Sequence, residues 1–289
     1  MKITVLGSGT SHGIPVVGCS CPVCTSDDER DKRTRSSVYI EGRGGERALI
    51  DAGPEFRLQA VAAGINRLDG IFLTHAHADH IHGLDDVRSL CRNAPIPVYG
   101  NALTIAEMKE RFSYIWRDTQ LGGGKPKLTP VVVSGPVQIG DLTFTPAPVK
   151  HGILDILGWE VCECIRLESI PGESVRSEEP GRSFLYLTDT SAIPPSTHKQ
   201  LVEKDISRII IIGGLRMRPH ETHFTFQEAL NAALSLNAEK VYLTHICHSH
   251  SHAEIEEYCR NFMGNLDTST QNVKKAELHP AYDRLELYI

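Results

Sequence analysis

The sequence predicts one domain of mixed α/β type that spans residues 1–289. Short apolar runs recur along the chain, and the continuous ones are typical of strands buried on both faces. Segments with apolar residues at helical spacing separate several of these runs. A dense group of histidines and one aspartate stands directly after a predicted strand, where α/β sheets commonly place their ligands.

The apolar runs and the helical spacings place the individual elements. Strands are expected at residues 3–6, 37–40, 48–50, 70–74, 97–99, 142–145, 184–187, 209–212 and 241–244. Helices are expected at 101–112, 226–236 and 253–263, and the second follows a capping-box pattern from Thr225 to Glu228. Glycine-rich or polar stretches at 120–130 and 168–183 are expected to be loops.

Composition narrows the class of protein. The apolar fraction of 40% and the charged fraction of 23% fit a soluble globular chain. A formal charge of −6 argues against a nucleic-acid partner. No signal peptide and no membrane-spanning run are evident, so we expect a cytoplasmic protein without a membrane partner. In that compartment the eight cysteines are expected to be thiols or metal ligands rather than disulfides.

The segment FLTHAHADHIHG contains the main group of candidate metal ligands. It places His75, His77, Asp79 and His80 immediately after the predicted strand at 70–74. Neutral imidazoles and carboxylates suit a divalent metal, and crowded imidazoles would repel one another if they were protonated. His75 and His77 could face one ion while Asp79 and His80 face a second. The alternative interpretation is a solvated histidine-rich loop.

A repeated strand ending supports the metal interpretation. The pattern Phe/Tyr-Leu-Thr followed by His or Asp occurs three times and ends at His75, Asp189 and His245. A fourth strand-like run leads to His151. Strand ends are rigid platforms for ligands. Asp189 alone could cap a helix, but its carboxylate could also bridge two metals.

Three cysteines lie close together near the N-terminus, at Cys19, Cys21 and Cys24. Three thiolates and one imidazole would fill a tetrahedral structural zinc site. A redox pair formed by Cys21 and Cys24 is the alternative, but no thioredoxin-like context surrounds it. The fourth ligand is not evident from nearby sequence.

Together these motifs resemble the metallo-β-lactamase superfamily of binuclear hydrolases over essentially the whole chain. The resemblance implies a four-layer αββα sandwich with the site at one edge of its two sheets. It implies one metal on His75, His77 and His151, and a second on Asp79, His80 and His245. Asp189 would bridge the two ions, which could be manganese, iron or zinc.

The start LGSGTSHGIPVVGCSCPVC is similar to that of the carbon–phosphorus lyase accessory phosphodiesterases, the PhnP family. This resemblance implies hydrolysis of a small cyclic phosphodiester such as phosphoribosyl 1,2-cyclic phosphate, and a homodimer. It also implies a structural zinc on a loop around residues 18–25. Its ligands would be Cys19, Cys21 and Cys24 with His248, and His250 and His252 are rivals for the fourth position.

The expected mechanism is attack on phosphorus by a metal-bridging hydroxide, with a histidine that protonates the leaving oxygen. The family position of this acid matches His223, and His220 is the alternative. Asp51, after the strand at 48–50, is expected either to orient a metal-bound histidine or to have a structural role. Arg216 and Arg218 could contact a substrate phosphate or simply lie in a solvated loop.

Other functions stay open at this point. A tRNA-processing nuclease, a lactonase or a thioesterase of the same superfamily would use the same metals. A non-catalytic carrier similar to the pyrroloquinoline quinone biosynthesis protein B family would share the fold and the cysteine site. The chain departs from shorter PhnP-family members between residues 152 and 183, which include Trp159, Cys162 and Cys164. That segment could reshape the pocket.

Overall fold

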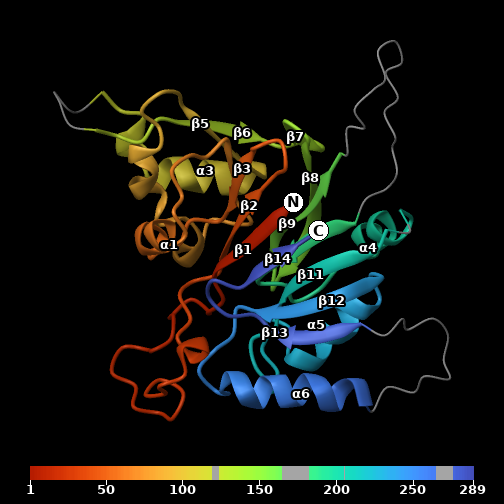
Figure 1. Cartoon of the computed structure of the whole chain (residues 1–289). Helices are drawn as coiled ribbons and strands as arrows, with labels where there is room; N and C mark the ends of the chain where they lie inside the picture. The colour runs from red at the N-terminus through yellow and green to blue at the C-terminus, as the bar shows by residue number, and fades with distance from the viewer. Residues whose placement is uncertain (119–123, 165–181, 205, 265–275) are drawn as a thin grey trace.

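The computed structural model describes residues 1–118, 124–164, 182–204, 206–264 and 276–289, and it contains two mixed seven-stranded sheets (Figure 1). The first sheet has the strand order β14-β1-β2-β3-β4-β5-β6. Its members are β1 (Lys2–Gly7), β2 (Ser37–Glu41), β3 (Arg47–Ile50), β4 (Gly70–Phe72), β5 (Ile96–Gly100), β6 (Leu128–Val132) and β14 (Glu286–Tyr288). Strands β3 to β6 run parallel to one another, while β14, β1, β2 and β3 pair antiparallel.

The second sheet repeats this mixed pattern in the order β13-β12-β11-β10-β9-β8-β7. Its members are β7 (Val137–Ile139), β8 (Leu142–His151), β9 (Leu154–Glu163), β10 (Ser183–Leu187), β11 (Arg208–Gly213), β12 (Ala238–Thr244) and β13 (Glu277–Pro280). Strands β10 to β13 are parallel, and β7 to β10 pair antiparallel.

Helices cover the outer face of each sheet, which completes a four-layer αββα sandwich (Figure 1). The helices are α1 (Phe56–Ala62), α2 (Ala78–Ile81), α3 (Ala102–Arg111), α4 (Pro195–Val202), α5 (Phe226–Leu234) and α6 (His252–Gly264). Helices α1 and α3 pack on the first sheet, and α4, α5 and α6 pack on the second. This confirms the predicted fold class. No helix among the described residues has the length and apolar character needed to cross a bilayer.

The two sheets pack directly against each other through large apolar side chains. Phe72 of the first sheet stacks on Phe144 of the second with ring centroids 3.7 Å apart. On the opposite face of β4, Ile71 packs under the helices. Because the central strands are buried on both faces, their sequences are continuous apolar runs rather than alternating ones.

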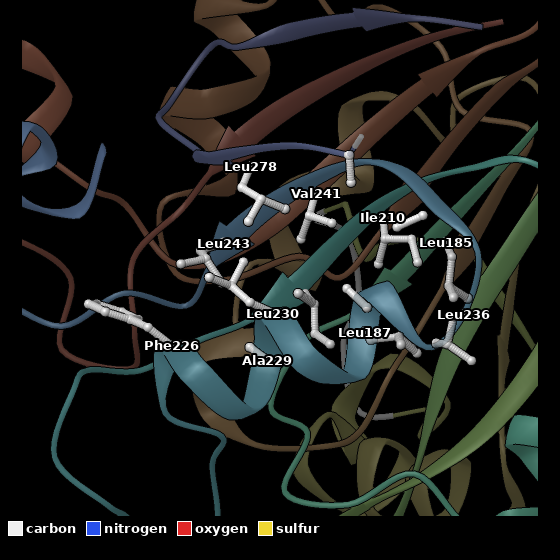
Figure 2. Packing of buried hydrophobic residues seen from close by; sticks show 14 of the residues in the cluster. Leu185, Leu187, Ile210, Phe226, Ala229, Leu230, Leu236, Val241, Leu243 and Leu278 are labelled. Atoms are coloured by element: carbon white, nitrogen blue, oxygen red, sulfur yellow. The ribbon is translucent and has the colours of Figure 1, made fainter. Parts of the chain in front are cut away.

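Helix α5 shows why the predicted capping box was informative. The Thr225 hydroxyl accepts a hydrogen bond from the Glu228 N–H, and the Glu228 carboxylate accepts one from the Thr225 N–H. The helix then buries Phe226 and Leu230 against the second sheet, as Figure 2 shows. The cap fixes where the helix starts, and therefore where the preceding loop delivers its side chains.

Several strands were not predicted. β6 begins inside the stretch 120–130 that was expected to be a loop, and β9 fills the first part of the segment 152–183. Trp159 on β9 is fully buried between the sheets, and its indole N–H donates to the carbonyl of Leu73 at 3.3 Å. Trp159 therefore belongs to the core between the sheets, and an effect of the segment 152–183 on a pocket stays a prediction. The expected loop at 168–183 lies almost wholly outside the described residues.

Candidate metal centre

The predicted ligands meet at one edge of the sandwich because they follow the carboxyl ends of strands from both sheets. His75 and His77 follow β4, and Asp189 and His245 follow β10 and β12 of the second sheet. His151 is the last residue of β8. The short helix α2 supplies Asp79 and His80, which completes the set.

The backbone bends sharply at three of these strand ends. Asp51, Asp189 and His245 have φ angles of 61°, 53° and 56°, in the left-handed region. Such conformations cost about 1–3 kcal/mol each in residues other than glycine, and they concentrate at functional sites. The backbone of Gly213 also lies close to that of Asp189. Any larger residue at position 213 would place its Cβ 2.9 Å from the Asp189 nitrogen, so glycine is needed there. The fold therefore holds these side chains at a cost in stability.

The side chains form two adjoining groups. Within each group, the potential ligand atoms all lie within 4.8 Å of one another. One group is His75, His77 and His151, and the other is Asp79, His80, Asp189 and His245. Asp189 joins them, because its Oδ2 lies 3.7 Å from His75 Nε2 while its Oδ1 lies 3.2 Å from His245 Nε2. The arrangement is a binuclear-type group of histidines and aspartates, and a bridging role for Asp189 stays a prediction.

The distances in the second group fit a metal ion. His80 Nε2 lies 3.2 Å from Asp79 Oδ2 and 3.5 Å from Asp189 Oδ1. Four ligands placed 2.0–2.1 Å from one ion at the corners of a tetrahedron are about 3.3 Å apart. The Nε2 atoms of His75, His80 and His245 are buried without a hydrogen-bond partner. Since buried polar atoms are normally satisfied, one cation beside His75 and a second beside His80 and His245 would explain all three among the described residues.

Hydrogen bonds on the outer side of the rings fix their orientation. His80 Nδ1 donates to Asp51 Oδ2 at 2.7 Å, and Asp51 in turn accepts from the Thr74 N–H and hydroxyl, each at 2.8 Å. His151 Nδ1 donates to the Thr222 carbonyl at 2.8 Å. Each bond leaves Nε2 free to face the centre, as in metal sites with supported histidine ligands. Asp51 thus occupies the place predicted for it.

Burial and mutual contact set the protonation of these groups in the metal-free chain. Burial, followed by the charge of His80, holds the pKa of His75 well below its usual value. Burial opposes ionisation of Asp189, but the His245 and His80 imidazoles outweigh it and hold the Asp189 pKa well below its usual value. The neutral form of His75 and the ionised form of Asp189 are the ones that bind metals. Burial opposes a charge on His80, but the Asp79 and Asp189 carboxylates outweigh it and raise the His80 pKa well above its usual value, so His80 would lose a proton when it binds an ion.

His223 lies over the two groups. Its ring centroid is 4.7 Å from that of His151 and 4.8 Å from that of His245, on which it stacks. His220 is exposed and lies 5.1 Å from His223, and its Nδ1 accepts a hydrogen bond from the Thr222 N–H. Of the two candidates for the acid, His223 therefore has the position nearer to the centre.

The two arginines of this loop differ in their contacts. The Arg216 guanidinium donates to the carbonyls of Arg218 and Pro219, at 3.3 and 3.4 Å, and so shapes the loop. Arg218 is exposed. A phosphate contact by either arginine stays a prediction.

The cysteines form a separate group with His248. Their Sγ atoms lie 3.4, 3.5 and 3.5 Å from His248 Nδ1, for Cys19, Cys21 and Cys24 respectively. A tetrahedral zinc bound to sulfur at 2.3 Å and nitrogen at 2.0–2.1 Å would hold these atoms about 3.6 Å apart. The backbone N–H of Cys24 points at Cys21 Sγ and lowers the Cys21 pKa to about 6, which favours a thiolate. Of the three candidate histidines, His248 is the one that the structure brings to the cysteines.

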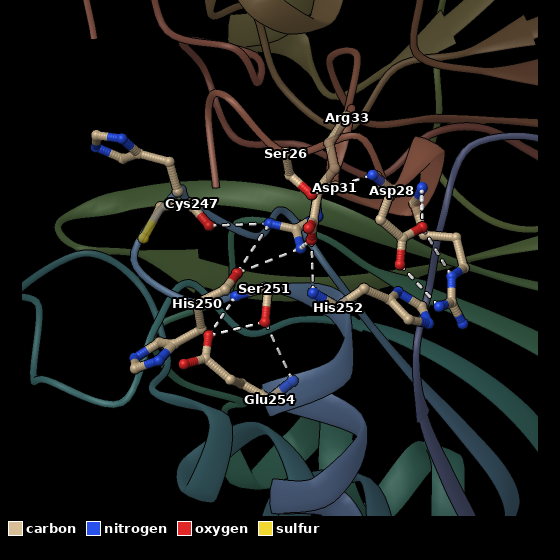
Figure 3. Close-up of polar contacts among 12 residues, drawn as sticks. Ser26, Asp28, Asp31, Arg33, Cys247, His250, Ser251, His252 and Glu254 are labelled. Carbon is tan, nitrogen blue, oxygen red and sulfur yellow. Dashed lines mark hydrogen bonds and ion pairs between the residues drawn. The ribbon is translucent and has the colours of Figure 1, made fainter. Parts of the chain in front are cut away.

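Sequence reasoning missed a buried arginine beside this cysteine group. Arg33 is fully buried and pairs with Asp31 at 3.0 Å, while its guanidinium donates to the carbonyls of Cys247 and His250 on either side of His248 (Figure 3). Asp31 also accepts the first N–H of α6, from His252, at 2.6 Å. Nothing in the charged run around Arg33 distinguishes it, because the carbonyls that it binds lie more than two hundred residues away in sequence.

An αββα sandwich with this histidine and aspartate set at one edge of its sheets defines a metal-dependent hydrolase of the metallo-β-lactamase type. The family described as Beta-lactamase superfamily domain matches residues 46–246. The chain belongs to the metallo-β-lactamase superfamily.

Comparison with known proteins places the chain near the PhnP family. A crystal structure described as a new diphosphatase from the PhnP family is 35% identical, with a TM-score of 0.78, and the match covers 100% of this chain and 97% of that one. This confirms the resemblance indicated by the cysteine pattern. Zinc-bound PqqB from Methylobacterium extorquens shares the fold at 16% identity and a TM-score of 0.73, over 100% of both chains.

A curated relative is longer than this chain. An octanoyltransferase from Porphyromonas gingivalis is 34% identical over 291 residues, which cover 100% of this chain and 52% of that protein. The chain therefore spans about half the length of this relative. About half of that octanoyltransferase has no counterpart in this chain, and its name describes the full-length protein.

Proposed function

We propose that this chain is a binuclear metal-dependent phosphodiesterase that hydrolyses a small phosphodiester, such as the cyclic ester phosphoribosyl 1,2-cyclic phosphate. The observation that carries the proposal is the complete set of seven ligand side chains, with the His223 ring stacked on His245 and within 4.7 Å of His151. The cysteine group and the similarity to a PhnP-family structure support the phosphodiester over other superfamily substrates.

The proposed roles follow from position. His75, His77 and His151 would hold one divalent ion, Asp79, His80 and His245 the other, and Asp189 would hold both. Manganese, zinc and iron all suit this mixed nitrogen and oxygen set. When bound, such a pair of ions supplies an activated water and neutralises charge on a phosphoryl oxygen. A third ion, zinc, would occupy the cysteine group with His248.

His223 would deliver the proton to the leaving oxygen. Burial, followed by the charge of His245, lowers the pKa of His223 to about 3 in the chain alone. The acid role therefore requires that the substrate phosphate raise the affinity of His223 for a proton, as an adjacent anion does.

The experiment is a panel of phosphodiesters followed by phosphorus NMR. The panel contains phosphoribosyl 1,2-cyclic phosphate, bis(4-nitrophenyl) phosphate, a linear dinucleotide and a diphosphate ester, each with and without chelator. The proposal expects chelator-sensitive cleavage of phosphodiesters, with the cyclic ester among the better substrates. Efficient cleavage of lactones or acyl thioesters with no phosphodiester turnover would contradict it.

A diphosphatase is the second candidate, and the related PhnP-family structure described in those words favours it. A diphosphate linkage also presents phosphorus to the two ions, but its leaving group is a phosphate that departs without protonation. Diphosphate hydrolysis that does not need His223 would favour this candidate over the cyclic ester.

The remaining alternatives predict different measurements. A carrier would hold metal only at the cysteine group, whereas the hydrolase should hold about three ions per chain. A tRNA-processing nuclease is disfavoured by the net charge of −6, and we propose a small-molecule substrate without nucleic acid. We also propose that the protein is a homodimer and that it is located in the cytoplasm.

A further inference from the structure

Helix α3 is anchored at its first turn by one asparagine with two functions. Asn101 Oδ1 accepts the Thr104 N–H at 2.8 Å and so caps the helix, while its Nδ2 donates to the carbonyl of Asp155 at 2.9 Å. Because the backbone N–H of Thr104 can only donate, the capping bond identifies which amide atom is oxygen. The two bonds therefore need both ends of this side chain.

Arg111 anchors the other end of the helix. It is the last residue of α3, and its Nη1 donates to the carbonyl of Ala76. Its Nη2 forms an ion pair with Glu107 at 3.1 Å, in which both side chains are more than a third exposed. The helix has ten residues, so the two anchors are about 15 Å apart.

Both anchors end on segments that supply the same proposed half-site. Ala76 stands between His75 and His77 in the sequence. Asp155 lies on β9 opposite Lys150, next to His151 at the end of β8. The other half-site depends on α2 and on the ends of β10 and β12, so α3 connects the two ligand segments of one half-site across the two sheets.

We propose that Asn101 and Arg111 are positioning residues, and that α3 acts as a brace that sets the spacing between His151 and the pair His75 and His77. The inference rests on the proposed function, since it assumes that these histidines bind a metal. Without either anchor the two segments keep direct contacts such as the 3.0 Å hydrogen bond from the Leu157 N–H to the Thr74 carbonyl, but they lose their link through α3. The geometry of one half-site then loosens while the other keeps its own supports. Loss of a direct hydrogen-bond partner of a ligand typically lowers metal affinity 10–100-fold. The two anchors bind backbone carbonyls beside the ligands, so we expect an effect at the lower end of that range.

Two variants remove the proposed anchoring bonds while they preserve the stability of helix α3. Asn101→Asp keeps a carboxylate oxygen for the cap, which aspartate supplies as well as asparagine, but loses the donor to Asp155. Arg111→Met keeps an unbranched side chain of high helix propensity but loses the donor to Ala76. Glu107→Gln is the matched control, because it weakens only the exposed ion pair.

The measurement is a cobalt(II) titration of the full chain with zinc already bound at the cysteine group, followed by its visible absorption. His77→Ala identifies the spectral component of the braced half-site. We expect Asn101→Asp and Arg111→Met to weaken that component about tenfold and to leave the other within about threefold. Glu107→Gln should titrate like the parent, and the thermal midpoint of Asn101→Asp should stay near that of the parent.

Three outcomes would overturn the brace. Both cobalt ions could bind the two variants as they bind the parent, or both could weaken by the same factor. The affected component could also be the one that His77→Ala leaves intact. A parent that binds no cobalt at this centre contradicts the proposed function together with the brace, whereas the first three outcomes leave the proposed function standing.

Discussion

The role of His223 as the proton donor can be tested by changing the leaving group. His223→Ala removes a ring whose centroid is 4.7 Å from His151 and 4.8 Å from His245, and it leaves the seven proposed ligands in place. A general acid contributes about 10²–10⁴-fold, which corresponds to about 2.7–5.4 kcal/mol of transition-state stabilisation. The full loss should appear only where the departing oxygen must be protonated.

The assay compares two diesters with the same enzyme preparations. For His223→Ala, kcat on an alkyl ester should fall about 10²–10⁴-fold, while kcat on bis(4-nitrophenyl) phosphate should fall less than about tenfold. His220→Ala is the matched control, because His220 is exposed and lies farther from the ligands. Metal content is measured for each variant. Equal losses on both esters, with metal retained, would refute the reasoning.

Three further changes probe the supports of the centre. Asp51→Asn should weaken metal binding through His80 about 10–100-fold in a cobalt titration, and unchanged affinity would show that the Asp51 contact is dispensable. Arg33→Met leaves the Asp31 carboxylate buried without its partner, so the free energy of unfolding in urea should fall by about 3–5 kcal/mol at fixed zinc; a loss below about 1 kcal/mol would contradict this. Burial lowers the pKa of His252 to about 4 from 6.5, so the folded chain binds fewer protons and stability should decline as the pH falls through this interval. His252→Gln should flatten that decline, and an unchanged slope would assign it to other groups.

The sequence predicted those parts of the fold whose signal is local. Central strands such as 209–212 are buried on both faces and need apolar residues throughout, so the chain itself marks them. Helix 226–236 was marked by its capping box and was found at Phe226–Leu234. Edge strands such as β7, with a half-exposed pattern over three residues, carry no comparable signal.

The residues of the candidate site also fall into those that the sequence could identify and those that it could not. Histidines and aspartates at strand ends stand out because such residues are costly to bury without a purpose, and the structure gathers all of them. In the sequence, the buried Arg33 and the more exposed Arg111 could not be distinguished from the other arginines, since their importance lies in backbone carbonyls that only the folded chain brings near. The choice of His248 among three histidines likewise needed either family spacing or coordinates.

The left-handed backbone at Asp51, Asp189 and His245 bears on how this protein could be engineered. Together these three backbone conformations lower the free energy of unfolding by roughly 3–9 kcal/mol, which is a sizeable share of the stability of an ordinary domain. A chain that no longer had to bind metal could relax them with glycine and become more robust while losing its chemistry, which is the usual trade between stability and activity. Thermostable variants of this enzyme should therefore be sought in its edges and outer helices, and the strand ends should be left as they are.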